Sequence, residues 1–254
     1  MNGNKLFKIG FIIGSLVLCI IALRAWDHAL AGCKGWDGAP IITMKLPNKG
    51  GESCKNECMK NCEKKENEKP CGKGKEGCGK SCGSYITLGI KDIKKFHGEV
   101  CPGVALGYRA CQIALSNLYP GEIAPRGDQF VVCGTARACP ADAVSFITGA
   151  RYSKGSNGAF NGNLAFDETI GNSSYIFASM TSGKAIKLNN KFEFPKEFEE
   201  AKAKKDTDPE AKALVSRMGK CISNKILTAP DKEIFEVTQA PDFSWKEYKE
   251  KYLK

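Results

Sequence analysis

The segment from Gly50 to Gly83 limits where this 254-residue chain can build a folded core. It is rich in lysine, glutamate and glycine and contains almost no large apolar residues. Such a segment cannot bury a core of its own, so it needs cross-links or a metal to hold a shape. The core must therefore form elsewhere, and the stretch from Tyr85 to Pro241 has a length typical of one domain.

This segment also holds many of the cysteines of the chain. Cys58 and Cys62, like Cys78 and Cys82, are spaced to lie on one helix face. Disulfides between two such pairs would staple a helical hairpin, and we expect them here. A metal or iron–sulfur cluster is the competing interpretation, although tight Cys-x-x-Cys runs are missing. The third interpretation is that the segment is a flexible, surface-exposed insert. The six cysteines are Cys54, Cys58, Cys62, Cys71, Cys78 and Cys82.

The N-terminal residues have the layout of an export signal. Two lysines precede an apolar run at Ile9–Leu23, and Ala29-Leu30-Ala31 follows. Cleavage after Ala31 would release a soluble domain, whereas retention of the run would anchor it to a membrane. The sequence from Leu30 to Cys33 also resembles a lipobox, but the charged patch Arg24–His28 separates it from the apolar run. All three outcomes place the folded domain outside the cytoplasm.

The stretch from Phe96 to Gly103 brings metal-ligand groups together. His97, Glu99 and Cys101 contribute an imidazole, a carboxylate and a thiol, and the chain has only two histidines. Imidazole and thiolate together suit a transition metal, and we expect zinc, with iron as the alternative. The simpler interpretation is a hydrogen-bonded core histidine beside a small buried cysteine.

Cys101 falls at the predicted start of a helix. Pro102 suits the first helical position, because its missing N–H would have no intrahelical partner there. Apolar residues then recur at helical spacing as far as Leu118, and Pro120-Gly121 ends the pattern. Cys101 is thus the predicted N-cap, where unsatisfied N–H groups favour the thiolate that binds metal or attacks.

A second segment repeats this arrangement. Gln129–Cys133 reads as a short buried strand, after which Cys139-Pro140 opens an apolar pattern that ends at Gly149. We expect Cys139 to be the N-cap of this second helix, so that the two cysteines can converge on one site. Asp142 lies in the first helical turn, where its negative charge interacts favourably with the helix dipole. The functional alternative is that it orients a ligand or accepts a proton.

These motifs resemble the FmdE family, which takes its name from formylmethanofuran dehydrogenase. The family motif His-Gly-His-x-Cys-Pro-Gly, continuing into Leu-Gly-Tyr-Arg, is similar to residues 97–103 and 106–109. A second motif, Cys-x-x-Asp-Ala followed by Thr-Gly and a glycine-rich turn, is similar to residues 139–149 and Ser153-Lys154-Gly155. Residues 226–237 are similar to the closing helix and strand of the family. The resemblance covers roughly Tyr85 to Pro241.

The resemblance implies an α+β core that forms an intertwined homodimer. Within it we expect His97 and Cys101 to bind the metal, Cys139 to be the next ligand, and Glu99 to act as an occasional ligand or as a nearby base. Asp142 and Lys154 are the candidate cofactor-binding or substrate-binding residues, although Lys154 is equally suited to be a solvated loop lysine. The chain departs from the family pattern at Glu99, where the motif has a second histidine, and at Ala150, where many relatives have a cysteine.

The expected fold is a single α+β core domain with a mainly antiparallel sheet and packed helices. Segments 174–180 and 184–189 read as strands joined by a turn, and 158–166 adds another strand. Asp208-Pro209 opens a further helix, with a buried face that runs to Gly219. The expected divisions are 1–31 for the signal or anchor, 32–84 for the cysteine-rich arm, 85–242 for the core and 243–254 for a tail.

The formal net charge of +10 does not predict nucleic-acid binding, because lysines alternate with glutamates and no arginine-rich stripe or aromatic platform accompanies them. A basic surface outside the cytoplasm favours an anionic membrane or an acidic partner. The sequence therefore predicts an exported transition-metal-binding protein. The alternatives are a thiol-based redox enzyme that uses Cys101 and Cys139, and a binding module that has lost the metal site.

Overall fold

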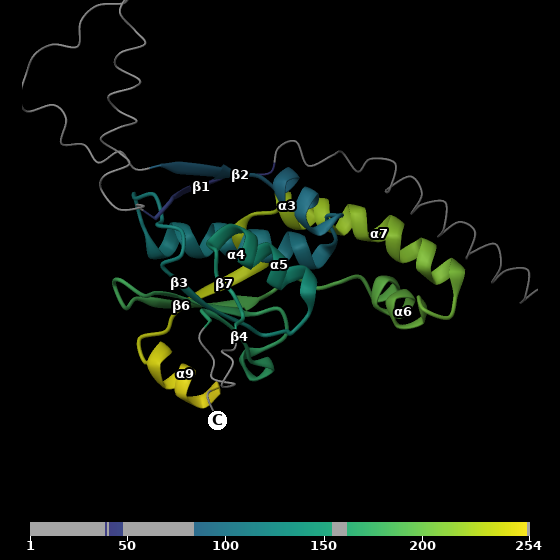
Figure 1. The fold of residues 1–254 in the computed structure, drawn as a ribbon. Coiled ribbons are helices and arrows are strands. Elements are labelled where there is room, and N and C mark those ends of the chain that lie inside the picture. Colours follow the sequence, from purple (N-terminus) through teal and green to yellow (C-terminus); the bar gives the residue numbers. More distant parts are fainter. Residues whose placement is uncertain (1–38, 40, 48–83, 154–161, 253–254) are drawn as a thin grey trace, which may run out of the picture.

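The structure is a computed structural model that describes residues 39, 41–47, 84–153 and 162–252 (Figure 1). The export signal, the cysteine-rich arm with its expected disulfides, and Lys154 lie outside the described residues, so those expectations stay predictions. Among the helices of the described ranges, none is both long and apolar enough to cross a membrane.

A five-stranded sheet organises the core, with the strand order β4-β3-β5-β6-β7. All neighbouring strands pair antiparallel except β3 and β4, which are parallel. The α+β class is confirmed, and so are the three predicted strands that correspond to β3, β5 and β6. Of the strand expected at 158–166, the described part contains only β4. The strands are β3 (Gln129–Cys133), β4 (Leu164–Phe166), β5 (Tyr175–Ser179), β6 (Ala185–Asn190) and β7 (Phe235–Gln239).

Both faces of the sheet are covered, so β3 and β5 are buried along their whole length. Successive residues of a strand point to opposite faces. Val131 and Phe177 therefore belong to the main core under α4 (Pro102–Leu118) and α5 (Ala138–Thr148), whereas Phe130 and Ile176 face the opposite side. There α9 (Trp245–Tyr252) packs over the sheet, as Figure 1 shows below the strands. The sheet thus lies between two helical layers.

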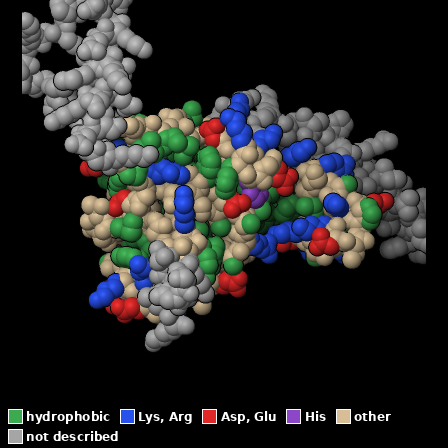
Figure 2. All heavy atoms as spheres, in the orientation of Figure 1, with side chains coloured by type: hydrophobic (Ala, Val, Ile, Leu, Met, Phe, Trp, Pro, Cys, Tyr) green, Lys and Arg blue, Asp and Glu red, His purple; other side chains and the backbone are tan. Residues whose placement is uncertain are grey.

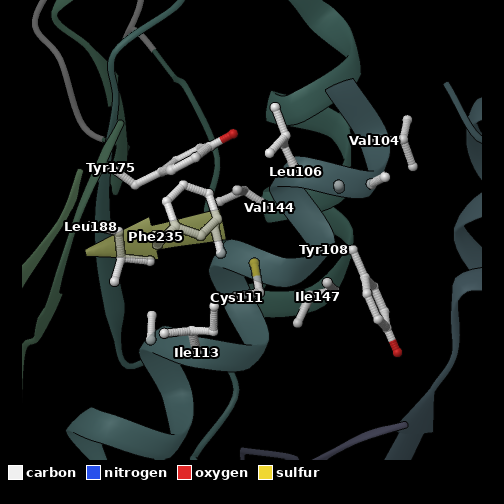
Figure 3. Close-up of a cluster of buried hydrophobic side chains, with 14 of the residues drawn as sticks. Val104, Leu106, Tyr108, Cys111, Ile113, Val144, Ile147, Tyr175, Leu188 and Phe235 are labelled. Carbon is white, nitrogen blue, oxygen red and sulfur yellow. The ribbon is translucent and has the colours of Figure 1, made fainter. Parts of the chain in front are cut away.

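Helix α4 is the centre of the main core. Figure 3 shows Cys111 and Ile113 of α4 on the side of Tyr175, Leu188 and Phe235 from the sheet. On its other sides α4 contacts α5 and α7 (Pro209–Thr228). Tyr108 of α4 also donates a hydrogen bond to the Leu88 carbonyl of β2 (Tyr85–Leu88), which pairs antiparallel with β1 (Ile42–Lys45). Because nearly every side of α4 is covered, its N-terminus is fixed relative to all these elements.

The remaining helices surround this centre. Asp208 caps α7 as predicted, since its carboxylate accepts hydrogen bonds from two backbone N–H groups. The expected stop at Gly219 is wrong, because α7 continues to Thr228 and places this glycine against Pro102 of α4. The other helices are α3 (Ile90–His97), α6 (Lys196–Lys204), α8 (Asp231–Ile234) and the 3-10 helix Glu168–Ile170.

Candidate metal centre

Three separate elements bring His97, Cys101 and Cys139 together. His97 is the last residue of α3, Cys101 is the N-cap of α4, and Cys139 lies in the first turn of α5. One potential ligand atom from each residue lies within 4.8 Å of the others. All three side chains are only partly buried, and the histidine side chain is visible at the molecular surface beside acidic and hydrophobic side chains (Figure 2). The three residues expected to bind a metal therefore lie close together.

The first cysteine occupies the predicted N-cap position. Cys101 Sγ accepts a hydrogen bond from the Val104 N–H at 3.5 Å, and Pro102 follows at the first helical position. The loop before it is held from both ends. Gly98, at φ +96°, donates its N–H to the Lys94 carbonyl and turns the chain out of α3. The Val100 carbonyl accepts a hydrogen bond from Ser223 Oγ of α7 at 2.9 Å.

The second cysteine does not occupy the predicted N-cap position. Helix α5 begins at Ala138 with Arg137 as the N-cap, so Cys139 is the second helical residue and Pro140 the third. A helix can start this early because the N–H groups of its first turn have no intrahelical partners, which makes the missing N–H of Pro140 harmless. Of the two predicted ends of this helix, the C-terminal end at Gly149 is confirmed. The backbone of Gly149 is in the left-handed region.

Two glycines of α4 allow the two helix starts to meet. A Cβ atom on Gly103 would lie 3.0 Å from Cys139 Cβ, and one on Gly107 would lie 2.7 Å from the Pro140 carbonyl oxygen. Any larger side chain at Gly107 would therefore collide with the backbone of α5. The spacing of these glycines by one helical turn puts both on the face that contacts α5.

Asp142 fixes the orientation of His97. Its Oδ2 lies 2.8 Å from His97 Nδ1, which leaves Nε2 as the ring nitrogen available to a ligand. Burial alone would lower the pKa of His97, but the hydrogen bond to Asp142 and the nearby Cys101 outweigh it and raise the pKa. A carboxylate on the far nitrogen of an imidazole is a common arrangement around metal-binding histidines.

The two thiols are electrostatically unequal. A hydrogen bond from the Cys101 thiol lowers the pKa of Cys139 to about 7, although burial opposes this shift. The same hydrogen bond, together with burial, raises the pKa of Cys101. The pair therefore loses its first proton from Cys139, and the proton that remains on Cys101 is donated toward that sulfur.

The other predicted site residues lie apart from these three ligand atoms. Glu99 is exposed in the loop between α3 and α4, and its negative charge acts on Cys139 by raising the pKa of that thiol slightly against the main shift. Its carboxylate is not among the grouped ligand atoms. Lys154 lies outside the described residues, so no contact can be assigned to it.

The sequence patterns did not predict a pocket of about 580 Å³ beside the metal-ligand cluster. Asp142 lines both sites, which makes them neighbours. The pocket draws on residues from α3, α5, β4 and two loops. Arg126, Arg151, Tyr152, Leu164 and Phe166 lie outside the two cysteine–proline segments. The side chains that define it are Phe96, Arg126, Phe146, Arg151, Tyr152 and Phe166.

Comparison with known proteins identifies the family of this chain. No functionally curated protein matches the chain. One matching solved structure is a protein from Syntrophus aciditrophicus that is like the FmdE component of tungsten formylmethanofuran dehydrogenase, with 22% identity over 59% of this chain and 69% of that chain, at a TM-score of 0.38. The family model described as "FmdE, Molybdenum formylmethanofuran dehydrogenase operon" matches residues 96–236, more than half of the chain. The chain therefore belongs to the FmdE family.

Proposed function

We propose that this protein binds a transition metal, preferably zinc, through His97, Cys101 and Cys139. The observation that carries the proposal is that three ligand atoms from three separate elements lie within 4.8 Å of one another, while Asp142 holds the non-ligating nitrogen of the histidine. Two sulfurs and one imidazole form a donor set that suits zinc, and iron is the alternative.

The spacing of the donors supports the proposal. Sulfur and nitrogen ligands around a tetrahedral zinc lie about 2.3 Å and 2.0 Å from the ion, and so about 3.3 to 3.8 Å from each other. Donor atoms within 4.8 Å reach that spacing by small side-chain rotations. The lowered pKa of Cys139, about 7, further supports binding because thiolates, not thiols, ligate metals.

The surrounding residues have separate tasks in this proposal. Asp142 accepts a hydrogen bond from Nδ1–H of His97 and so leaves Nε2 as the nitrogen that would face the metal, while Gly103 and Gly107 keep the two sulfurs within reach. Zinc with three protein ligands supplies a Lewis acid with one open coordination position. Glu99, exposed beside the cluster, is suited to occupy that position or to serve as a base.

Location and assembly form a further part of the proposal. The two lysines, the apolar run Ile9–Leu23 and the following Ala29-Leu30-Ala31 support export, with the domain released or kept at the membrane. Membership of the FmdE family supports a homodimer. Fractionation of cells, N-terminal sequencing of the mature chain and light scattering of the purified protein test these points.

Elemental analysis tests the metal centre directly. The full chain, purified without added chelator, is expected to hold about one zinc per polypeptide, and His97→Ala is expected to lose it. His28→Ala, which removes the other histidine, is the matched control and should keep its zinc. A wild-type protein without stoichiometric zinc or iron, combined with an unchanged His97→Ala variant, would contradict the proposal.

A thiol-based redox enzyme is the second candidate, because the two cysteine sulfurs share a hydrogen bond. Here the Cys139 thiolate attacks a substrate disulfide and Cys101 resolves the mixed disulfide, so the protein gains one disulfide and the substrate becomes two thiols. Incubation of zinc-free protein with oxidised glutathione should then remove two hydrogens from the protein mass. Persistence of both free thiols after incubation excludes this candidate, and Cys111→Ala serves as the control, since Cys111 is fully buried.

A further inference from the structure

The pocket beside the metal-ligand cluster combines aromatic walls with two arginines. Phe96 and Phe146 form one aromatic pair with ring centroids 5.3 Å apart, and Tyr152 and Phe166 form another at 5.6 Å. Phe96 is 58% exposed and Tyr152 is 49% exposed, although both are large apolar side chains. Exposed aromatic side chains grouped in a concavity are typical of ligand-binding sites.

Arg126 is held in place by the backbone at the end of α5. Its Nε donates to the Ile147 carbonyl at 3.0 Å and its Nη2 donates to the Phe146 carbonyl at 2.9 Å. The third nitrogen, Nη1, faces Gly149, where a Cβ atom would approach it to 3.4 Å. The charge of Arg126 is therefore fixed in position by neutral partners, and no hydrogen bond within the described residues uses Nη1.

Arg151 places a second positive charge against the same pocket. Burial and the charge of Arg151 both lower the pKa of Arg126, so the two guanidinium groups lie close enough to repel each other. Within the described part of the chain neither arginine has a carboxylate partner in an ion pair. Asp142 also lines the pocket, but its Oδ2 is engaged by His97. The pocket thus presents a positive side and an apolar body.

We propose that this pocket is the substrate site and takes a planar organic carboxylate. Its two oxygens would lie between Arg126 and Arg151, and its flat apolar body would lie against the two aromatic pairs. Such a ligand would reach Asp142 and hence the edge of the metal-ligand cluster. The role as substrate site rests on the proposed metal centre, whereas binding of the carboxylate itself requires only the pocket.

A pair of isosteric probes tests the proposal on the full-length protein. Titration calorimetry compares 2-naphthoate with the neutral 2-naphthamide, both of which are small enough for a pocket of about 580 Å³. We expect naphthoate to bind at least about tenfold more tightly. A hydrogen bond between charged groups is roughly twice as strong as one between neutral groups, and this difference in strength corresponds to about tenfold in affinity. Equal affinities for the two probes would overturn the proposal.

Two arginine variants assign the effect to the pocket. Arg151→Gln and Arg126→Gln are each expected to weaken naphthoate binding about tenfold and to leave naphthamide binding unchanged. The control is Lys184→Gln, which removes an exposed positive charge from the turn between β5 and β6, outside the pocket. Arg151 is exposed and its side chain makes no hydrogen bond to the described residues, so its variant remains decisive if Arg126→Gln does not fold.

Measurement of zinc in the same samples separates this proposal from the metal centre. Both arginine variants should keep the wild-type metal content, whereas His97→Ala should lose the metal and still bind naphthoate within about threefold of the wild-type affinity. Naphthoate binding by a wild-type protein that holds neither zinc nor iron would refute the metal centre and leave a carboxylate site. Zinc binding with unchanged naphthoate affinity in both arginine variants would refute the carboxylate site alone.

Discussion

The two cysteine–proline segments of this protein share a Cys-Pro dipeptide, but the dipeptide takes a different position on each helix. Cys101-Pro102 straddles the start of α4, with the cysteine as the N-cap. Cys139-Pro140 lies wholly inside the first turn of α5, where the cysteine is the second helical residue. The same dipeptide therefore presents its sulfur from outside one helix and from inside the other.

This shift gives the third residue after each cysteine a different task. In the first segment that residue is Val104, whose N–H donates to Cys101 Sγ and whose side chain is fully buried. In the second it is Asp142, whose carboxylate holds His97. The first segment thus fixes the site to the core through buried Val104, while the second segment contributes the carboxylate that contacts His97. The comparison teaches that a repeated motif here builds two complementary halves of one site.

Replacement of either cysteine should have the largest effect. Cys101→Ser and Cys139→Ser are each expected to weaken zinc binding by more than about 100-fold, because even the outer-shell partners of metal ligands change affinity about 10- to 100-fold. Competition against a chromophoric zinc chelator measures the affinity. The control is Cys111→Ala in the core, which should retain the wild-type affinity. Retention of tight binding in one cysteine variant only would show that the halves are not equivalent as ligands.

Asp142 has no counterpart in the first segment, so its replacement separates the two halves. Asp142→Asn should weaken zinc binding about 10- to 100-fold, because an amide no longer accepts the His97 proton as a charged partner. Asp92, a partly exposed carboxylate that pairs with Lys95 and accepts the Gly89 N–H at the start of α3, offers Asp92→Asn as a charge-matched control. Equal affinities of the Asp142 and Asp92 variants would mean that the carboxylate does not orient the histidine.

The sequence alone predicted most of what local rules decide. The cap at Cys101, the stop at Gly149 and the buried strand Gln129–Cys133 all follow from proline, glycine and apolar patterns that act over a few residues. The predicted start of α5 is wrong by two residues, since proline is tolerated at several positions of a first turn and the pattern does not distinguish them.

Local sequence patterns could not predict the contacts between segments that lie far apart in the chain. The pairing of His97 with Asp142 and the pocket walls from Arg126 to Phe166 depend on how α3, α5 and β4 pack, which no short motif encodes. A signal was present for part of this, because Gly103 and Gly107 are spaced by one helical turn and predict a close helix contact. The arginines carried no such signal.

Gly107 tests whether the close contact of the helices holds the halves together. Gly107→Ala places a Cβ atom 2.7 Å from the Pro140 carbonyl oxygen and 2.9 Å from Ala143 Cβ, so the helices must separate. We expect a loss of about 1–3 kcal/mol in the free energy of unfolding by urea, typical of overpacking. Gly219→Ala is the control, since its Cβ atom would lie 3.7 Å from Pro102, an ordinary contact. A similar stability of both variants would contradict the assigned role of Gly107.

The smallest expected effect concerns the shared proton of the two sulfurs. In zinc-free protein the alkylation rate of Cys139 by iodoacetamide should rise with pH and reach half its maximum near pH 7, because the thiolate is the reactive form and the pKa is about 7. Cys101→Ala removes the donor of the hydrogen bond, so the midpoint should move upward, whereas Cys111→Ala should leave it in place. An unmoved midpoint in Cys101→Ala would assign the lowered pKa to the helix start of α5 instead, and the two cysteine–proline segments would then act independently.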